Sequence, residues 1–385
     1  MERRSVLRGV VGGGLAAGLA GQATAAQPSM ASAGQADRVG SAGQVPAGSA
    51  EEAGAPGLPL VQNPGELRGE MLYRPLGRTG EMVSAIGLGG SHIAKPPITK
   101  KEATHLMHEA IDRGITFMDN CWDYNEHRSL RWMGDALAEG GYRNKVFVMS
   151  KIDGRTKEVA ADQINDCLTW LRTDHIDLMQ HHEVLRYDDP DRIFGEGGAM
   201  EAVVEAQKAG KIRHIGFTGH KDPRIHLYML EVAGQHGFRF DTVQMPLNVM
   251  DAHYRSFAHL VLPHLVQQQI GVLGMKSMGS KIILKSGVVS APECLQYALS
   301  LPTSVVITGI DNQQVLDQAF KVAKEFRPLD RQQLAALLSK TEKAAQGGTY
   351  ELFKISAHFD ETARHPDWMG EDRPAVQRLA PELPG

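Results

Sequence analysis

The feature that most constrains the fold is a regular alternation of short apolar runs with stretches of helical periodicity. An apolar run of about four to eight residues is typical of a buried strand, whereas apolar residues spaced three and four apart are typical of an amphipathic helix. Eight apolar runs lie at residues 84–88, 115–119, 146–150, 176–180, 212–218, 242–246, 270–275 and 305–308. Strands that alternate with helices in this way predict a parallel sheet covered by helices.

Helical patterns fill the intervals between these runs. They lie at residues 99–113, 159–171, 199–209, 223–233, 254–269 and 314–326. Eight such units in about 250 residues are the usual size of a closed (β/α)8 TIM barrel, which we expect over residues 71–340, opened by a hairpin over residues 72–84. The alternative is an open doubly wound sheet, which would carry a G-x-G-x-x-G loop after an early strand. The spacing of Gly87, Gly89 and Gly90 does not match that loop.

Ionisable side chains collect at the ends of three successive predicted strands, as Asp119, Lys151 and the pair His181 and His182. The carboxyl ends of the strands carry the active site in barrels of this class. Charged groups are almost never fully buried unless they are paired, so these positions are unusual for a core. Tyr124 follows Asp119 closely and can reach the same barrel mouth. We therefore predict one functional site here, with unrelated ion pairs at loop starts as the structural alternative.

These residue types suit the reduction of a carbonyl group. Hydride addition leaves an alkoxide that needs a proton, so a general acid is required. The phenol of Tyr124, with an ordinary pKa near 10, stays protonated at neutral pH and can donate. The Lys151 ammonium would lower the pKa of that phenol, and Asp119 would keep Lys151 charged. His182 would hydrogen-bond the substrate oxygen or share in proton transfer.

The same segments resemble the aldo-keto reductases. The resemblance covers residues 72 to about 326 and is carried by residues 76–80, 114–124, 146–151, 176–182 and 210–217. In that family an Asp, a Tyr, a Lys and a His form a catalytic tetrad, and the resemblance places these roles on Asp119, Tyr124, Lys151 and His182. His182 is chosen over His181 by its spacing from Asp177, and His181 is expected to be an inward-facing or packed residue of the barrel.

The resemblance also implies that NADPH lies extended across the barrel mouth without a Gly-rich fingerprint. It places Gln244 at the nicotinamide carboxamide and Met275 against the nicotinamide face, where many members have an aromatic ring. Methionine covers a ring less specifically than an aromatic side chain does. The stretch that contains Lys276, Met278 and Gly279 is expected to line the pyrophosphate, with Lys276 as its charge partner.

Two positions depart from the family pattern. Thr218 is followed by Gly and His where many members have Ser-Asn, so one carboxamide hydrogen bond is expected to be missing or replaced. At the last strand many members place Arg or Lys after a Gly to hold the adenosine 2′-phosphate, whereas this chain has Ile310 and then Asp311 after Gly309. An acidic residue near the ribose favours a free 2′-hydroxyl. The expected cofactor is NADPH, with NADH as the alternative.

Residues 1–26 resemble a bacterial twin-arginine export signal. Arg3 and Arg4 precede a short Gly/Ala-rich apolar run that ends in an A-x-A site. The run has about half of the roughly 20 residues that a membrane span needs, so no stable membrane anchor is expected. Residues 27–70 are rich in Ala, Gly, Ser and Pro without apolar periodicity and predict a disordered linker. Residues 341–385 are expected to form a tail that packs on or near the barrel.

Composition narrows the partners further. The formal net charge of -4 carries no basic excess, so nucleic acid is not expected as a partner. Three scattered cysteines are too few for a disulfide framework or a zinc site, and no metal is expected. The protein is expected outside the cytosol, periplasmic or extracellular, after transient contact with the twin-arginine export machinery. Because nicotinamide cofactors are made in the cytosol, we expect the cofactor to be loaded before the folded protein is exported.

The leading prediction is therefore NAD(P)H-dependent reduction of a small aldehyde or ketone, with sugars among the candidate substrates. A non-catalytic nucleotide-binding or redox-sensing barrel subunit is the first alternative, and it would not need all four tetrad residues. A metal-dependent barrel hydrolase is the second alternative. His181, His182 and His220 could form a cluster, but such an enzyme needs more carboxylate and histidine ligands at its strand ends.

Overall fold

The computed structural model describes residues 57–370 of the chain, and its centre is a closed parallel barrel of eight strands. Around the barrel the strands follow the order β10-β11-β4-β5-β6-β7-β8-β9. Their bounds are β4 (Ile86–Gly89), β5 (Phe117–Asp119), β6 (Phe147–Ile152), β7 (Ile176–His181), β8 (Ile212–Thr218), β9 (Thr242–Pro246), β10 (Gly271–Met275) and β11 (Val305–Gly309). Each apolar run identified in the sequence overlaps one of these strands, so the predicted (β/α)8 barrel is confirmed.

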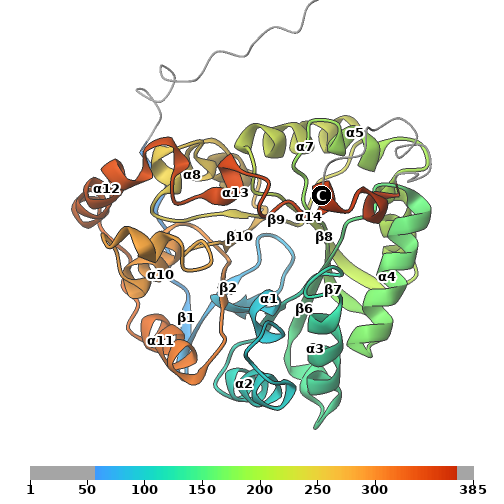
Figure 1. Cartoon of the computed structure of the whole chain (residues 1–385), viewed down its shortest axis with the longest axis horizontal. Helices are drawn as coiled ribbons and strands as arrows, with labels where there is room; N and C mark the ends of the chain where they lie inside the picture. Colours follow the sequence, from blue (N-terminus) through green and yellow to red (C-terminus); the bar gives the residue numbers. More distant parts are fainter. Residues whose placement is uncertain (1–56, 371–385) are drawn as a thin grey trace, which may run out of the picture. The chain divides into compact units, whose positions relative to one another are not determined.

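Helices surround the barrel in chain order, as the colour progression in Figure 1 shows. The helices are α1 (Gly90–Ile93), α2 (Lys100–Asp112), α3 (Arg128–Ala138), α4 (Lys157–Leu171), α5 (Asp189–Phe194), α6 (Ala199–Lys208), α7 (Pro223–Gln235), α8 (Phe257–Leu260), α9 (Leu262–Gln267), α10 (Ala291–Ser300), α11 (Gln313–Lys324), α12 (Arg331–Ala345), α13 (Leu352–Ile355) and α14 (Glu361–Arg364). Local sequence sets several of their starts. Thr99 and Ser290, for example, each form a capping box with a Glu three positions later.

One predicted helix is divided in the structure. The pattern over residues 254–269 becomes two short helices, α8 and α9, with Val261 between them. Pro263 stands in the first turn of α9. Proline has no N–H to donate and is tolerated in the first turn of a helix but not in its interior, so it starts a new helix here.

A small antiparallel sheet of β1 (Glu66–Arg68), β2 (Met71–Pro75) and β3 (Met82–Ser84) precedes the barrel. The turn between β2 and β3 contributes Leu76, which is fully buried in one cluster with Phe117 and Phe147. These two aromatic residues begin β5 and β6, so the hairpin fills the amino-terminal end of the barrel interior. The opposite end, at the strand carboxyl termini, is left for the functional site.

Residues 57–70 correct the predicted boundary of the linker. The sequence places them in a disordered segment, but Leu58 is buried and the Val61 N–H donates to the Ser300 carbonyl at 2.8 Å. Strand β1 also pairs with β2. The prediction is wrong for these residues because their packing partners lie far along the chain and leave no local periodicity. The rest of the predicted linker, and the predicted export signal, lie outside the described residues.

The carboxyl-terminal segment reaches the barrel mouth. His220, just after β8, contacts the Asp360 carboxylate at 3.1 Å, and Glu183, just after β7, accepts the Thr362 N–H at 2.8 Å. Helix α12 extends past residue 340, where the barrel was expected to end, to Ala345. Residues 371–385 of the predicted tail lie outside the described part of the chain.

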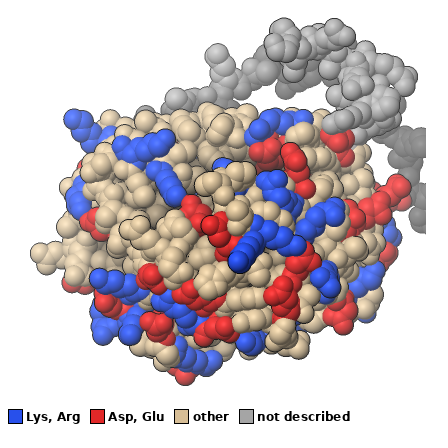
Figure 2. All heavy atoms as spheres, turned by 60° about the horizontal axis from the view of Figure 1, so that its bottom comes forward, with Lys and Arg blue, Asp and Glu red and all other residues tan. Residues whose placement is uncertain are grey.

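The molecular surface is of mixed charge where it can be seen. On the face drawn in Figure 2, Lys and Arg side chains are interspersed with Asp and Glu side chains. This mixture accords with a formal net charge of only -4. Of the helices within residues 57–370, none combines the length and the apolar character that crossing a membrane requires.

Candidate active site

The four residues of the predicted tetrad meet at the carboxyl ends of β5, β6 and β7. Asp119 is the last residue of β5, Lys151 lies near the end of β6, and His182 directly follows β7. Tyr124 comes from the loop after β5. All four line one pocket with a volume of about 760 Å³. The parallel pairing of neighbouring strands delivers their side chains to the same barrel end, as the sequence predicts.

The Lys151 ammonium is the centre of this group. It donates to Asp119 Oδ1, to the Asn120 carbonyl at 2.7 Å and to the Tyr124 hydroxyl at 3.3 Å. The lysine is 1% exposed, so it would be costly without these partners. An ammonium has three N–H donors, and these three acceptors use all of them. The arrangement therefore holds a positive charge directly beside the Tyr124 hydroxyl.

The phenol of Tyr124 is protonated in this setting. Burial raises the pKa of Tyr124 well above its usual value near 10, and the negative charge of Asp119 adds to the rise. The sequence predicts that Lys151 lowers this pKa, but the net shift is upward, with burial as its largest cause and the Asp119 carboxylate next. A phenol with a raised pKa can still give its proton to a strong base such as an alkoxide.

His182 presents one ring nitrogen to the pocket and keeps the other below it. Its Nδ1 lies 2.9 Å from Asp153 Oδ1 and 3.2 Å from Cys121 Sγ. The rings of His182 and Tyr124 meet edge to face, with centroids 5.9 Å apart. Burial lowers the pKa of His182, so its imidazole is neutral at pH 7. With Nδ1 engaged, Nε2 is the nitrogen left for a substrate.

The metal-dependent hydrolase alternative also requires His181 and His220, but these two side chains have other surroundings than His182. His181 is fully buried, neither of its ring nitrogens has a hydrogen-bond partner, and burial lowers its pKa to about 3. It is therefore packed as a neutral ring on the face of the sheet that its register partners Ile152 and Phe217 share with the surrounding helices, not in the barrel interior. His220 contacts Asp360, and burial lowers its pKa to about 3 as well. Within residues 57–370, neither joins a group of potential metal ligands, so the three histidines form no cluster.

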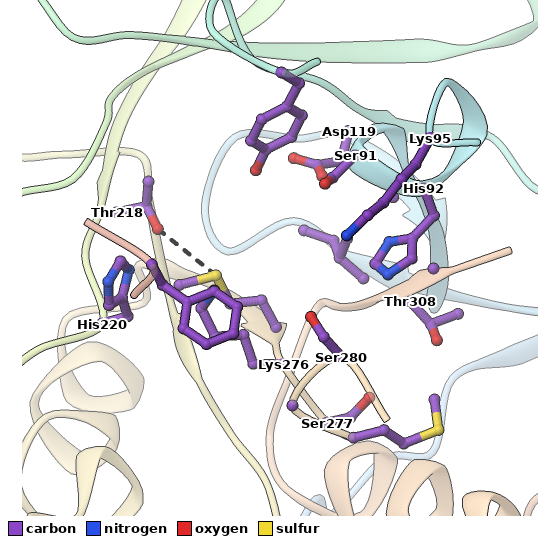
Figure 3. Close-up of a pocket in the computed structure, with 18 of the residues that line it drawn as sticks. Ser91, His92, Lys95, Asp119, Thr218, His220, Lys276, Ser277, Ser280 and Thr308 are labelled. Atoms are coloured by element: carbon purple, nitrogen blue, oxygen red, sulfur yellow. Dashed lines mark hydrogen bonds between the residues drawn. The ribbon is translucent and has the colours of Figure 1, made fainter. Parts of the chain in front are cut away.

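The residues expected to bind the dinucleotide line the other side of the same pocket. They are Thr218, Gln244, Met275, Lys276, Met278, Gly279 and Gly309. Figure 3 shows part of this wall, with the Thr218 hydroxyl directed at the Met275 sulfur, 4.0 Å away. The side-chain oxygen of Gln244 is buried without a hydrogen-bond partner. It can accept from the amino group of a carboxamide, so this wall fits a nicotinamide ring.

Lys276 has an unusual environment that the sequence does not predict. The residue has a left-handed backbone with φ of 54° and is half-buried. Its ammonium lies 5.4 Å from the Phe353 ring centre and 5.1 Å from that of Phe359. Burial of the ammonium lowers its pKa to about 8. Both aromatic rings come from the carboxyl-terminal segment, whose contacts have no local sequence signal.

Asp311 is the one predicted cofactor residue that does not line the main pocket. It lines a neighbouring cavity of about 570 Å³ together with His92 and Lys95. Its carboxylate pairs with Lys281 at 2.9 Å. Gly309 packs so closely that a Cβ there would lie 2.4 Å from the His92 ring. The acidic side chain is thus accompanied by lysines, which the sequence alone does not reveal.

Comparison with known proteins agrees with this geometry. A model described as the aldo/keto reductase family matches residues 85–292, which is more than half of the chain. Aldo-keto reductase YhdN of Bacillus subtilis strain 168 is 28% identical over 216 residues, covering 53% of this chain and 61% of that protein. L-galactose dehydrogenase of Arabidopsis thaliana is 25% identical over 232 residues, covering 56% and 67%. The match thus spans about 61–67% of the length of these curated relatives.

Solved structures share the fold at lower identity. The holo form of an aldo-keto reductase from Bacillus halodurans superposes with a TM-score of 0.58 at 20% identity, covering 69% of this chain and 96% of that one. A chain from Pseudomonas aeruginosa superposes with a TM-score of 0.54 at 21% identity, covering 66% and 94%. With the barrel, the convergent side chains and the matching family model in place, the chain belongs to the aldo/keto reductase family.

Proposed function

We propose that this protein is an NAD(P)H-dependent oxidoreductase that reduces an aldehyde or ketone to an alcohol, with Tyr124 as the general acid. One observation carries the proposal: the Tyr124 hydroxyl lies 3.3 Å from the buried Lys151 ammonium, on the wall of a pocket that also holds the unpartnered Gln244 amide oxygen. One wall offers a proton donor, and the other offers an acceptor for a carboxamide.

The side chains divide the work of the reaction. The bound dinucleotide supplies the hydride. The Tyr124 hydroxyl and the His182 Nε2–H donate to the substrate carbonyl oxygen and polarise it; His182 has this tautomer when its Nδ1 accepts from the Cys121 thiol. As negative charge grows on that oxygen, the Tyr124 hydroxyl gives up its proton to form the alcohol. The Lys151 ammonium, held charged by Asp119, stabilises the phenolate that remains until solvent reprotonates it.

For the substrate we propose a small carbonyl compound, with sugars as the first class to test. Two relatives carry sugar names: L-galactose dehydrogenase, and 6-dehydroglucose reductase of Novosphingobium aromaticivorans, which is 29% identical over 168 residues. The pocket wall includes the polar side chains of Asn125, His358 and Arg364, which suit a substrate rich in hydroxyl groups. A non-catalytic sensor role has no specific observation in its favour.

For the cofactor we propose NADPH, with NADH as the alternative. The Lys281 ammonium beside Asp311 supports this choice, because it offsets the carboxylate that would otherwise repel a 2′-phosphate. We further propose that the protein is exported to the periplasm with the cofactor already bound. Mass spectrometry of protein recovered from the periplasm tests this, and cofactor-free protein that binds dinucleotide only weakly would contradict it.

Spectroscopic titration followed by a substrate panel tests the proposed activity. Difference spectra with NADPH and NADH identify the cofactor, and a panel of carbonyl compounds and sugars is then run on wild type and Tyr124→Phe. The variant should keep its dinucleotide affinity within about threefold and lose about 10²- to 10⁴-fold in turnover. Full reductase activity in Tyr124→Phe would refute the proton-donor role.

A further inference from the structure

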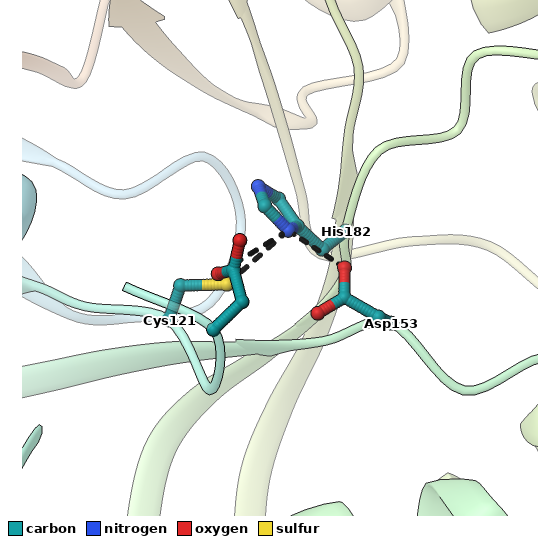
Figure 4. A group of neighbouring side chains, drawn as sticks. Cys121, Asp153 and His182 are labelled. Carbon is teal, nitrogen blue, oxygen red and sulfur yellow. Dashed lines mark hydrogen bonds and ion pairs between the residues drawn. The ribbon is translucent and has the colours of Figure 1, made fainter. Parts of the chain in front are cut away.

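Four side chains with metal-binding atoms converge beside the pocket, which two of them, Asp123 and His182, line. The proposed reduction uses only His182. They are Cys121 and Asp123 from the loop after β5, Asp153 just after β6, and His182 after β7. All four are buried, and one ligand atom from each lies within 4.8 Å of the others. Figure 4 shows the Cys121 thiol and the Asp153 carboxylate directed at the same ring nitrogen of His182.

The spacing around His182 Nδ1 suits a four-coordinate ion. Nδ1 lies 2.9 Å from Asp153 Oδ1, 3.2 Å from Cys121 Sγ and 3.8 Å from Asp123 Oδ1. Zinc–ligand bonds of about 2.0 Å to nitrogen or oxygen and about 2.3 Å to sulfur separate tetrahedral ligands by roughly 3.3–3.6 Å. The three measured separations fall on both sides of that range. Small side-chain rotations would therefore bring all the ligand atoms onto one ion.

The two carboxylates in this group lack sufficient partners. Asp123 Oδ1 and Asp153 Oδ2 are both buried and accept no hydrogen bond, and Oδ1 is the Asp123 atom that faces His182. The nearby cations are committed elsewhere. Lys151 is held by Asp119, and the Arg155 guanidinium pairs with Asp189 at 2.9 Å. The charges of Arg155 and Lys151 still favour the ionised form of Asp153, but they do not outweigh its burial. A buried carboxylate with too little counter-charge is costly, so a further cation would stabilise the cluster.

Protons are the alternative source of that charge. Burial raises the pKa of Asp123 to about 7, and the neighbouring Asp153 adds to the rise. Burial likewise raises the pKa of Asp153 to about 7.

We propose that Cys121, Asp123, Asp153 and His182 bind one divalent metal ion, and that this ion is Zn²⁺. The mixture of thiolate, imidazole and carboxylate ligands suits zinc, whereas Mg²⁺ and Ca²⁺ prefer oxygen ligands alone. Four protein ligands fill a tetrahedral shell and leave no open position, so the ion has a positioning role. The count of three scattered cysteines predicts no zinc site, but the fold brings together four side chains that could hold an ion with a single cysteine among them.

The ion would also fix the tautomer of His182. When Nδ1 of a neutral imidazole coordinates a metal, the proton resides on Nε2. Nε2 then acts as a hydrogen-bond donor toward the pocket. This consequence rests on the proposed function, because it matters for a substrate carbonyl oxygen. Metal binding itself does not depend on that function.

Metal analysis of the untagged full-length protein tests the proposal. The protein is stripped with a chelator and reconstituted with Zn²⁺ or with Co²⁺ as a spectroscopic probe. We expect one Zn²⁺ per chain, a rise in melting temperature on Zn²⁺ addition, and a Co²⁺ form with tetrahedral visible bands and a near-ultraviolet thiolate band. Cys121→Ser should lose the thiolate band. Asp153→Asn should weaken Zn²⁺ binding at least about tenfold.

A matched control is available in α10. Cys294 is also a buried free cysteine and lies outside the cluster, so Cys294→Ser should keep the full metal content and the Co²⁺ spectrum. Circular dichroism checks the folding of each variant, and Asp123→Asn replaces Cys121→Ser if that variant does not fold. Wild type that binds well under one Zn²⁺, or variants that bind as wild type does, would overturn the proposal. Loss of carbonyl reduction with full metal content would instead count against the proposed function alone.

Discussion

Two buried lysines in this protein have similar partners and opposite surroundings. Lys151 and Lys354 are each 1% exposed, and each contacts a carboxylate and a backbone carbonyl. Lys151 also reaches the Tyr124 hydroxyl on the pocket wall. Lys354 instead reaches a second carboxylate, that of Glu351, at 3.0 Å. One lysine therefore faces a titratable hydroxyl in a pocket, and the other is enclosed by anions.

The enclosed network is fully satisfied. Asp251, the partner of Lys354 at 2.7 Å, also accepts the Phe257 and Ala258 N–H groups, each at 3.0 Å. Glu351 accepts from the Asn248 amide at 2.9 Å. The three charged members of this network do not line the main pocket. Residue type alone thus does not separate the lysine of the proposed active site from a structural lysine. What separates them is that Lys151 lies beside a hydroxyl on an open pocket wall.

Substitution of each lysine tests whether Lys151 serves turnover and Lys354 serves stability, and it should give the largest effects. Lys151→Met should lower turnover about 10²- to 10⁴-fold, because the proton donor loses its charged neighbour. Lys354→Met should keep turnover near that of wild type and lower the free energy of unfolding by about 3–5 kcal/mol, since two carboxylates stay buried without their cation. The Lys151 variant should lose less stability because Asp119 lines the pocket, where water can reach it. Steady-state kinetics and urea denaturation measure the two effects, and equal losses of turnover would break the distinction.

Lys276 extends the comparison to a lysine held mainly by aromatic rings. Its pKa is lowered to about 8 by burial, although Glu183, Asp360 and Asp119 favour the charged form, while Lys151 opposes it. The ammonium is charged below about pH 8 and loses its proton above it, so affinity for a pyrophosphate should fall as pH rises. Between pH 7 and pH 9 we expect the dissociation constant of the dinucleotide to increase about tenfold.

Two variants of this lysine separate charge from packing. Lys276→Arg should bind the dinucleotide without this pH dependence, because arginine stays charged. Lys276→Met should bind weakly at both pH values. Fluorescence titration measures the constants, and an equally steep pH dependence in Lys276→Met would show that another group is responsible.

The smallest expected effect concerns the exposed pair of Asp311 and Lys281. Because this ion pair is partly exposed to solvent, each charge should change binding only modestly. Asp311→Ala should improve the affinity for NADPH relative to NADH by about three- to tenfold, and Lys281→Ala should shift the ratio the other way. Titration of both dinucleotides at low and high salt measures the ratio of the two affinities. If neither variant changes this ratio, the 2′-phosphate does not bind near Asp311 and Lys281.

The sequence predicts the barrel well because its signals are local. Each strand is a continuous apolar run, and a residue at the carboxyl end of a parallel strand lies at the barrel mouth. The sequence alone therefore predicts that Asp119 and Lys151 lie at the barrel mouth. The loop after β5 and the start of α3 are less predictable from the sequence. Asn125, Glu126 and His127 all have positive φ, so no ordinary capping signal announces α3.

The missed features all depend on contacts between distant segments. Asp153 has no significance in the sequence until β7 brings His182 to it, 29 positions later. Phe353 flanks Lys276 only because the carboxyl-terminal segment returns to the barrel mouth. Leu58 likewise becomes a core residue only through packing that the local composition does not encode. These residues carry no periodicity of their own, so sequence reasoning passes over them.

Deuterium labelling of the dinucleotide tests whether the Tyr124 site reduces a carbonyl group by hydride transfer. Wild type and Tyr124→Phe are each given the preferred dinucleotide, deuterated at C4 in one epimer or the other, together with the best carbonyl substrate. Mass spectrometry then locates the label. With one of the two epimers, we expect one deuterium on the former carbonyl carbon of the wild-type product. Tyr124→Phe should give almost no product despite full dinucleotide binding. An unlabelled alcohol with both epimers, or equal labelled product from Tyr124→Phe, would contradict these expectations.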